Sequence, residues 1–358
     1  MRKKQPIALL AAVLAGILPA CQKESPGNRP ATVLVSIDSG SDGTRTTTAT
    51  DASESLVNDL QVFVFDSGGD LDGYGHTTSA SELTVSTVAG MHEIWAVTNA
   101  PDLSTVTTRN ELLGTAITLA GQATGNLIHA GGTVEKLSGR TTIRIVPEHL
   151  VSRVTIRKIT NRLAPEAVSS LPLVITDIYL TNVAGDGAIG GGQAPTSWYN
   201  PMGLRNELDR FLHDRVDATD GTIPLGGSYE RDHRFYLMPN PTLDDSRSAT
   251  WCARCTRLVI RAEIGGEAFF YPITLPAGGS NRSYDIAELV IGRIGVKDEE
   301  TAIPFSEIAY HSGSVPQLTE ENRTLGFLPS EVILAFGQPD VNSFDPVSGD
   351  VHCQVTNP

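Results

Sequence analysis

Residues 18–45 constrain the fold more than any other stretch, because they place a cysteine, a strand and a basic residue in that order. Cys21 is followed by a polar spacer and then by the apolar run 31–37, and a Gly/Ser/Asp linker leads to Arg45, where a protease could cut. Removing such a strand from a β-sandwich would open a groove that another chain's strand can fill. Side chains alternate across a strand, so one set of the run must face inward, and the expected inward set is Val33, Val35 and Ile37.

The first twenty residues have the pattern of a signal peptide. Basic residues at 2–4 precede an apolar run over 7–18, which is too short to span a bilayer as a permanent helix. Residues 18–21, Leu-Pro-Ala-Cys, match the lipobox of bacterial lipoproteins. We therefore expect residues 1–20 to be removed and Cys21 to carry lipid. An ordinary signal peptide that happens to contain Cys21 is the alternative.

The remaining composition favours a surface protein built from strands. A chain of 358 residues suits two domains, and 40% hydrophobic residues are enough for a buried core. The 34 Gly and 21 Pro favour short strands joined by turns. The net charge of -14 argues against nucleic acid, which needs a basic face, and is best explained by solubility.

Runs rich in β-branched and aromatic residues predict an all-β fold. Residues 67–70, Ser-Gly-Gly-Asp, signal a hairpin turn, 105–122 hold the best helix candidate, and Gly131-Gly132 predicts a break. In the run 150–159 we expect Val154 and Ile156 to face a core and Arg153 and Arg157 to face solvent. The predicted strands after the first are 60–66, 83–88, 93–98, 141–146, 150–159, 173–180, 234–238, 256–264, 267–275 and 284–292.

Residues 161–170, with Pro165 and small side chains, mark the expected crossing between two domains. The division is then a signal peptide at 1–20, a lipidated propeptide at 21–45, a first sandwich at 46–163 and a second at 164–358. The tail after Ile294 is less regular. Its one apolar run, the candidate for a strand given to a partner, contains Val332, Ile333, Leu334, Ala335 and Phe336.

Three cysteines remain beside Cys21. Cys252 and Cys255 form a Cys-x-x-Cys pair, which could be a redox motif, half of a zinc site or a local disulfide, and Cys353 lies near the C-terminus. The pair ends a polar loop before a strand, whereas a thioredoxin-type motif opens a helix, and no second pair with zinc spacing follows. Outside the cytoplasm a loop disulfide is the favoured state.

Motifs for nucleotide binding, metal-dependent hydrolysis and serine hydrolysis are missing from the sequence. We therefore predict no catalytic, metal or cofactor site, and we expect that the protein is not an enzyme. Side chains distant in sequence could still converge on such a site.

The order of these features resembles the fimbrillins, the lipoprotein-derived subunits of Bacteroidales type V pili. The resemblance covers roughly residues 1–295. It rests on the lipobox with Cys21, the run 31–37 before Arg45, and the segments 60–66, 90–101 ending Asn-Ala-Pro, 150–159 with Arg153, 175–182, 235–241, 271–273 and 281–286.

The resemblance implies two transthyretin-like β-sandwich domains with few short helices, export as a lipoprotein, cleavage after an arginine and polymerisation by strand exchange. Cys21 would be the lipidated residue and Arg45 the cleavage position. Arg29 is a poorer candidate, because Pro30 follows it and a cut there would leave the strand attached. The implied partners are other fimbrial subunits and, before processing, the outer membrane.

Two features depart from the family. The tail after Gly295 has no Trp-containing β-rich run, and the Cys-x-x-Cys pair is not expected. Position as a shaft, tip or anchor subunit therefore stays open, as does any host or bacterial surface ligand. The competing function is a lipid-anchored surface binding or anchor protein that keeps its N-terminal strand and does not polymerise.

Overall fold

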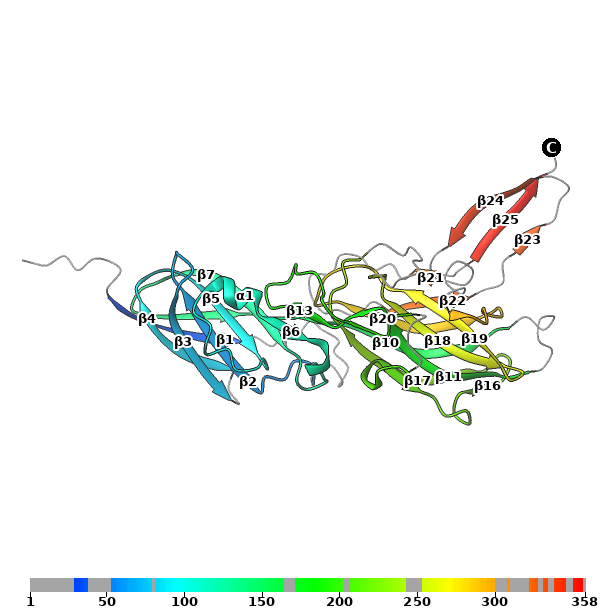
Figure 1. Cartoon of the computed structure of the whole chain (residues 1–358), viewed down its shortest axis with the longest axis horizontal. Helices are drawn as coiled ribbons and strands as arrows, with labels where there is room; N and C mark the ends of the chain where they lie inside the picture. The colour runs from blue at the N-terminus through cyan, green and yellow to red at the C-terminus, as the bar shows by residue number, and fades with distance from the viewer. Residues whose placement is uncertain are drawn as a thin grey trace, which may run out of the picture.

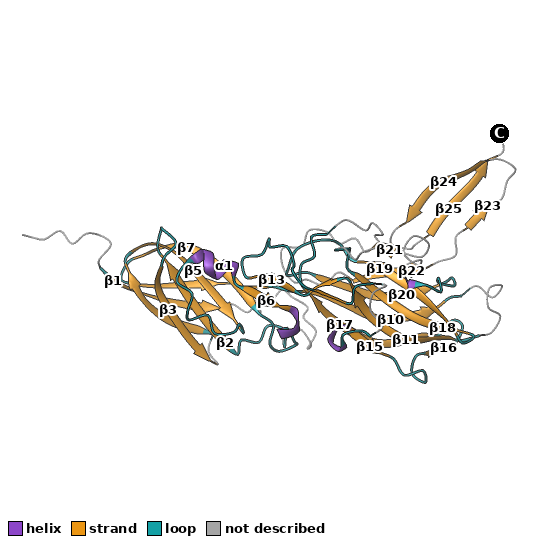
Figure 2. Ribbon diagram, in the orientation of Figure 1, coloured by secondary structure: helices purple, strands orange, loops and turns teal. Residues whose placement is uncertain are grey.

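A computed structural model describes residues 29–37, 53–78, 81–163, 171–202, 207–242, 253–299, 308–309, 322–327, 331–333, 338–345 and 350–356. The described residues form two β-sandwiches arranged end to end and a smaller sheet that projects from the second sandwich (Figure 1). Strands dominate and helices are few and short (Figure 2). The predicted all-β class is confirmed. Within these residues, no helix is long and apolar enough to cross a bilayer.

The first sandwich consists of a three-stranded and a five-stranded sheet. The smaller sheet has the order β4-β1-β8, with β4 at Glu82–Val88, β1 at Pro30–Ile37 and β8 at Arg140–Ile145. The larger has the order β3-β2-β5-β7-β9, with strands Leu71–Thr78, Asp59–Phe65, Gly90–Thr98, His129–Leu137 and Glu148–His149.

The second sandwich also has two sheets. One has the order β17-β10-β20-β22, with strands Ser228–Leu237, Ser152–Asn161, Ser283–Ile291 and Asn322–Phe327. The other has the order β15-β11-β18-β19-β21, with strands His213–Arg215, Leu173–Thr181, Arg257–Ile264, Glu267–Thr274 and Ile308–Ala309, while β16 (Thr222–Ile223) also pairs with β11.

Several short strands and helices lie outside the sheets of the two sandwiches. β6 (Ala116–Thr118) lies between β5 and β7 of the first sandwich in the sequence, and it pairs antiparallel with β13 (Asp186–Ala188) of the second half. The others are the helix α1 (Arg109–Gly114), the 3-10 turns η2 (Leu119–Gly121) and η3 (Arg210–Leu212), and the pair β12 (Val183–Ala184) and β14 (Trp198–Tyr199).

The C-terminal strands form a separate sheet, drawn in red in Figure 1. Its order is β23-β25-β24, with β23 at Glu331–Ile333, β25 at Asp350–Thr356 and β24 at Gln338–Asp345. β25 runs parallel to β23 and antiparallel to β24.

β2 has buried side chains on both faces, which explains its continuous apolar sequence. Val62 and Val64 contribute to a core shared with the β4-β1-β8 sheet. Phe63 and Phe65 contribute to a larger core that includes Leu112 of α1 and continues into the second sandwich. The first sandwich therefore has one core that β1 closes and another that joins it to the rest of the molecule.

Residues 105–122 contain a helix as predicted: α1 occupies Arg109–Gly114 and begins with a capping box of Thr108 and Glu111. The break predicted at Gly131-Gly132 is wrong. Gly131-Gly132 does not break the chain but lies inside β7, where a Cβ on Gly132 would come within 2.6 Å of the Trp95 ring. The glycine is therefore needed for close packing within a strand.

The strand β10 lies in the second sandwich, because it pairs with β17 and β20. A first domain ending at residue 163 would have included it. The chain thus enters the second sandwich at Ser152, the first residue of β10, before the crossing expected at 161–170. The interior positions Val154 and Ile156 are buried as predicted.

Candidate assembly site

β1 is the central strand of its sheet. It runs antiparallel to β4, from the pair Pro30–Val88 to the pair Ser36–Glu82, and parallel to β8, from the pair Thr32–Arg140 to the pair Ile37–Ile145. A central strand pairs its backbone groups on both sides. Since β1 is also the first described strand of the chain, no described strand before it would have to be moved if it left.

The inner face of β1 fills the smaller core. Ala31, Val33, Val35 and Ile37 are buried, with Val33 and Val35 fully enclosed, whereas Leu34 on the other face is only half-buried. Each fully buried valine contributes about 1.5–3 kcal/mol to stability. The strand forms with the alternation that the sequence predicts at Val33, Val35 and Ile37.

The ends of β1 are fixed by backbone hydrogen bonds outside the regular ladders. The amide of Ala89 donates to the Arg29 carbonyl at 2.8 Å, and the amide of Ile37 donates to the Ser81 carbonyl at 2.8 Å. The β1 strand is therefore held along its whole length in the uncleaved chain. A cut after Arg29 would separate only the residues before it and leave β1 in place.

Departure of β1 would leave a slot between β4 and β8. The slot would have a row of backbone donors and acceptors on each side, and a floor of apolar side chains that includes Val64, Val85 and Ile94. Unpaired backbone groups next to an apolar floor are recognised by an extended peptide with apolar residues at alternate positions.

Other predicted site residues are described only in part. Cys21, Arg45 and Cys252 lie outside the described residues, as do Leu334, Ala335 and Phe336. Val332 and Ile333 lie in β23, and Cys353 lies in β25, so neither segment belongs to a sandwich sheet. The Cys255 thiol is half-buried and lies 3.6 Å from the Thr242 carbonyl oxygen.

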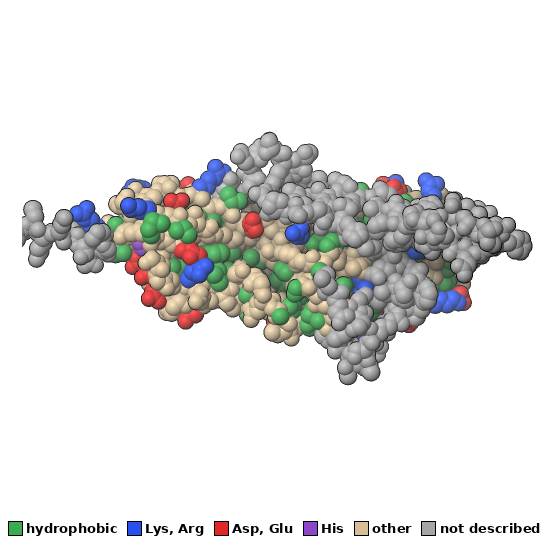
Figure 3. All heavy atoms as spheres, turned by 90° about the horizontal axis from the view of Figure 1, so that it is seen from above, with side chains coloured by type: hydrophobic (Ala, Val, Ile, Leu, Met, Phe, Trp, Pro, Cys, Tyr) green, Lys and Arg blue, Asp and Glu red, His purple; other side chains and the backbone are tan. Residues whose placement is uncertain are grey.

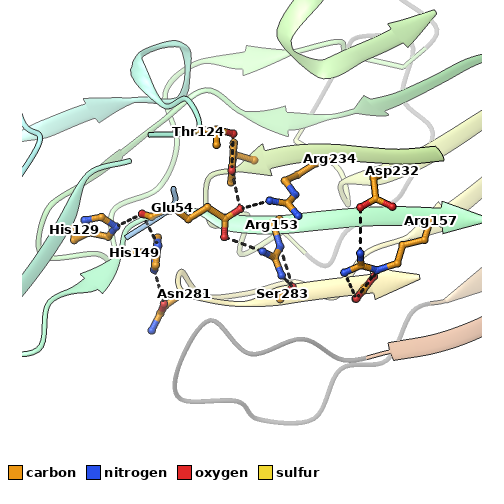
Figure 4. A network of polar contacts seen from close by, with 12 residues as sticks. Glu54, Thr124, His129, His149, Arg153, Arg157, Asp232, Arg234, Asn281 and Ser283 are labelled. Atoms are coloured by element: carbon orange, nitrogen blue, oxygen red, sulfur yellow. Dashed lines mark hydrogen bonds and ion pairs between the residues drawn. The ribbon is translucent and has the colours of Figure 1, made fainter. Parts of the chain in front are cut away.

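The predicted solvent exposure of Arg153 is wrong. Its side chain is 2% exposed and lies against the Glu54 carboxylate, with Nη1 donating to Oε2 at 2.8 Å (Figure 4). Thr155, on the same face of β10, is also buried. The alternation of β10 predicts a half-solvated strand, but β10 begins at the junction between the sandwiches, and both faces of its first five residues are buried.

Within the described part of the chain, no cluster of His, Cys, Asp and Glu side chains could hold a metal ion. The visible face carries both acidic and basic side chains rather than a broad basic surface (Figure 3).

Comparison with known proteins gives this geometry a context. Residues 31–141 match the family model of the major fimbrial subunit protein (FimA), and the match begins within β1 and ends within β8. No curated protein sequence matches the chain.

Two solved structures share the fold. A fimbrilin (FimA) from Porphyromonas gingivalis W83 superposes with a TM-score of 0.56 at 14% identity, covering 91% of this chain and 96% of the fimbrilin. A candidate cell adhesion protein from Bacteroides eggerthii superposes with a TM-score of 0.57 at 18% identity, covering 77% of this chain and 92% of the other.

The resemblance to the fimbrillin family is confirmed by the family match and the shared fold. That family is one of fimbrial structural subunits and not of enzymes, and the match to this chain covers residues 31–141.

Proposed function

We propose that this protein is exported as a lipoprotein to the outer membrane and polymerises into an adhesive fimbria when proteolysis releases β1. The observation that carries the proposal is the central position of β1 between β4 and β8. Only the loss of an internal strand leaves a two-sided slot, and an N-terminal strand can leave after a single cut.

Cys21 is the proposed lipid attachment site, since the lipobox and the polar spacer place it a few residues before β1. Lipid at this position would keep the precursor at the membrane through the same segment that is later removed. Processing would then free the subunit from the membrane and open its slot in one step.

Arg45 is the proposed cleavage position. The first described segment ends at Ile37 and the next begins at Ser53, and Arg45 is the only Lys or Arg between them. β1 precedes this interval and the rest of the sandwich follows it. A trypsin-like cut there would release β1 without removing any other described strand.

The strand supplied to a partner is proposed to come from the C-terminal sheet. One candidate is the run of Val332, Ile333, Leu334, Ala335 and Phe336, of which Val332 and Ile333 belong to the short strand β23. β25 is the better match, because its seven residues come close to the eight of β1 and its sequence alternates Val351, Cys353 and Val355 with polar residues.

Changing Arg45→Ala tests the proposal, with Arg29→Ala as the matched control. We expect the Arg45→Ala protein to remain a lipidated monomer that retains β1, while Arg29→Ala assembles as the unchanged protein does. Gel ladders, electron microscopy and N-terminal sequencing of surface material would read the outcome. Normal assembly of Arg45→Ala with β1 still attached would refute strand release and favour an anchor or binding protein.

A further inference from the structure

Residues 54–58 contact both sandwiches. The first sandwich binds the backbone of this segment. His129 of β7 and His149 of β9 direct Nε2 at the Glu54 carbonyl oxygen, at 3.0 and 3.3 Å (Figure 4). Asn99 donates to the Leu56 carbonyl at 2.7 Å and accepts from the Asn58 amide at 2.8 Å. The first sandwich therefore fixes this segment without any contribution from the Glu54 carboxylate.

The Glu54 carboxylate is bound by the second sandwich. Arg153 Nη1 donates to Oε2 at 2.8 Å, while Arg234 Nη1 and the Tyr236 hydroxyl donate to Oε1 at 3.0 and 2.8 Å. Arg153 comes from β10, and Arg234 and Tyr236 come from β17. One residue thus receives hydrogen bonds through its backbone from one sandwich and through its side chain from the other.

This arrangement is enclosed and prepared for the carboxylate. The side chains of Glu54 and Arg153 are each 2% exposed. Ser283 holds Arg153 from behind, with its hydroxyl oxygen 2.8 Å from Nη2 and 3.2 Å from Nε. Burial of two opposite charges is tolerated when their remaining hydrogen-bonding groups are satisfied, but removing one charge leaves the other uncompensated. The contact is therefore strongly dependent on the charge at position 54.

The contacts of Glu54 do not include β1. The strands that pair with β1 are β4 and β8, whereas the groups that bind Glu54 lie in β7, β9, β10 and β17. Neutral contacts between described residues also cross the junction, among them the β6–β13 ladder, the pair Thr124–Tyr236 at 2.9 Å and the pair His149–Asn281 at 3.2 Å. Loss of β1 would leave all of them in place.

We propose that Glu54 is the joint that keeps the two sandwiches one rigid body, so that tension entering at the β1 slot passes to the second sandwich and its C-terminal strands. The contacts of Glu54 in the precursor are the evidence for the rigid joint. Its role under tension rests on the proposed function, because only a fibre loads the slot and the C-terminal sheet of one subunit together.

The joint is tested in the purified full-length precursor with Glu54→Gln. The amide keeps the size of the side chain but leaves Arg153 buried without a counter-charge. We expect a broader distance distribution in small-angle scattering and an unfolding midpoint lower by about 5 °C or more. Glu93→Gln is the matched control, because Glu93 also accepts from an arginine, Arg109, but within the first sandwich.

If Glu54→Gln fails to fold, Tyr236→Phe removes one hydrogen bond to the same carboxylate together with the Thr124–Tyr236 pair, and it should broaden the scattering distribution to a smaller extent. Thr124→Val, which removes only that pair, is then the added control and should broaden it less. The proposed joint would be overturned if the scattering of Glu54→Gln, or of Tyr236→Phe in its place, matched the scattering of Glu93→Gln.

The fibre measurement is separate. Fibres of Glu54→Gln should shear to shorter lengths than fibres of Glu93→Gln. Equal lengths together with altered precursor scattering would overturn the role under tension and leave the joint. If the unchanged protein forms no fibres at all, the proposed function fails, whereas the precursor scattering still decides the joint.

Discussion

The first described strand, β1, lies in the first sandwich, and the last described strand that joins a sandwich, β22, lies in the second. The two strands occupy different positions. β1 lies inside its sheet, between β4 and β8, and buries alternate side chains in the smaller core. β22 lies at the edge of its sheet, where it runs parallel to β20, and Leu325 and Phe327 complete the larger core. Phe327 also packs edge-on against Tyr271.

The difference shows which end can be exchanged to make an acceptor. Loss of an edge strand shortens a sheet and moves its open edge by one position, whereas loss of β1 divides a sheet into two strands with a slot between them. An incoming strand can satisfy both sides of the slot but only one side of an edge. In the proposed mechanism the first sandwich is therefore the acceptor, and the second keeps its own strand.

The largest expected effect comes from a charge on the inner face of β1. Val33→Asp would bury an unpaired carboxylate at a cost of several kcal/mol, so β1 should detach without cleavage. Hydrogen exchange should then show loss of protection in β4 and β8, and light scattering should show self-association. Leu34→Asp, on the half-exposed face, is the control. Equal protection in the two variants would contradict the account.

A smaller effect is expected in the second sandwich. Leu325 is 1% exposed, and Leu325→Ala should destabilise the protein by about 2–5 kcal/mol through the lost contacts and the cavity. Denaturant unfolding would measure the loss. Protection of β4 and β8 should stay unchanged and the protein should stay monomeric. Polymers of the uncleaved variant would show that the two end strands are not functionally different.

Gly132→Ala tests how tightly the first sandwich is packed. The added methyl group would meet the Trp95 ring, and overpacking of this kind costs about 1–3 kcal/mol. Gly114→Ala at the end of α1 is the control, because its Cβ would meet no atom within 4 Å. Thermal unfolding should separate the two. A Gly132→Ala protein as stable as the control would mean that Trp95 moves freely.

The smallest expected effect is a pH dependence at the junction. Burial lowers the pKa of His129 from 6.5 to about 3, with a further contribution from His149. The unfolded chain therefore binds the proton first, so stability falls as pH drops below 6.5, by about 1 kcal/mol between pH 7 and 5.5. His129→Gln should flatten this slope in denaturant titrations. An unchanged slope in His129→Gln would refute the assignment.

Local patterns were sufficient to predict most strands and the inward set of β1, because alternation and β-branched residues act over a few residues. They failed where the partner is distant. The sequence predicts a break at Gly132 because it does not show that Trp95 packs against this glycine. It predicts that Arg153 is exposed because the partner of Arg153, Glu54, is 99 residues away. β22 has few apolar residues, so only its pairing with β20 reveals it.

The central claim is that β1 must leave, and a reversible pin tests it directly. Leu34 and Thr84 are cross-strand partners on the outer face of β1 and β4, so Leu34→Cys with Thr84→Cys can lock the strand. The pin belongs in a background with Ser at Cys252 and Cys255 and Ala at Cys353, so that position 353 of the proposed donor strand stays apolar. This background is itself expected to assemble. After cleavage, the oxidised protein should stay monomeric and should polymerise on reduction. Polymerisation at the same rate with the disulfide intact would contradict strand release.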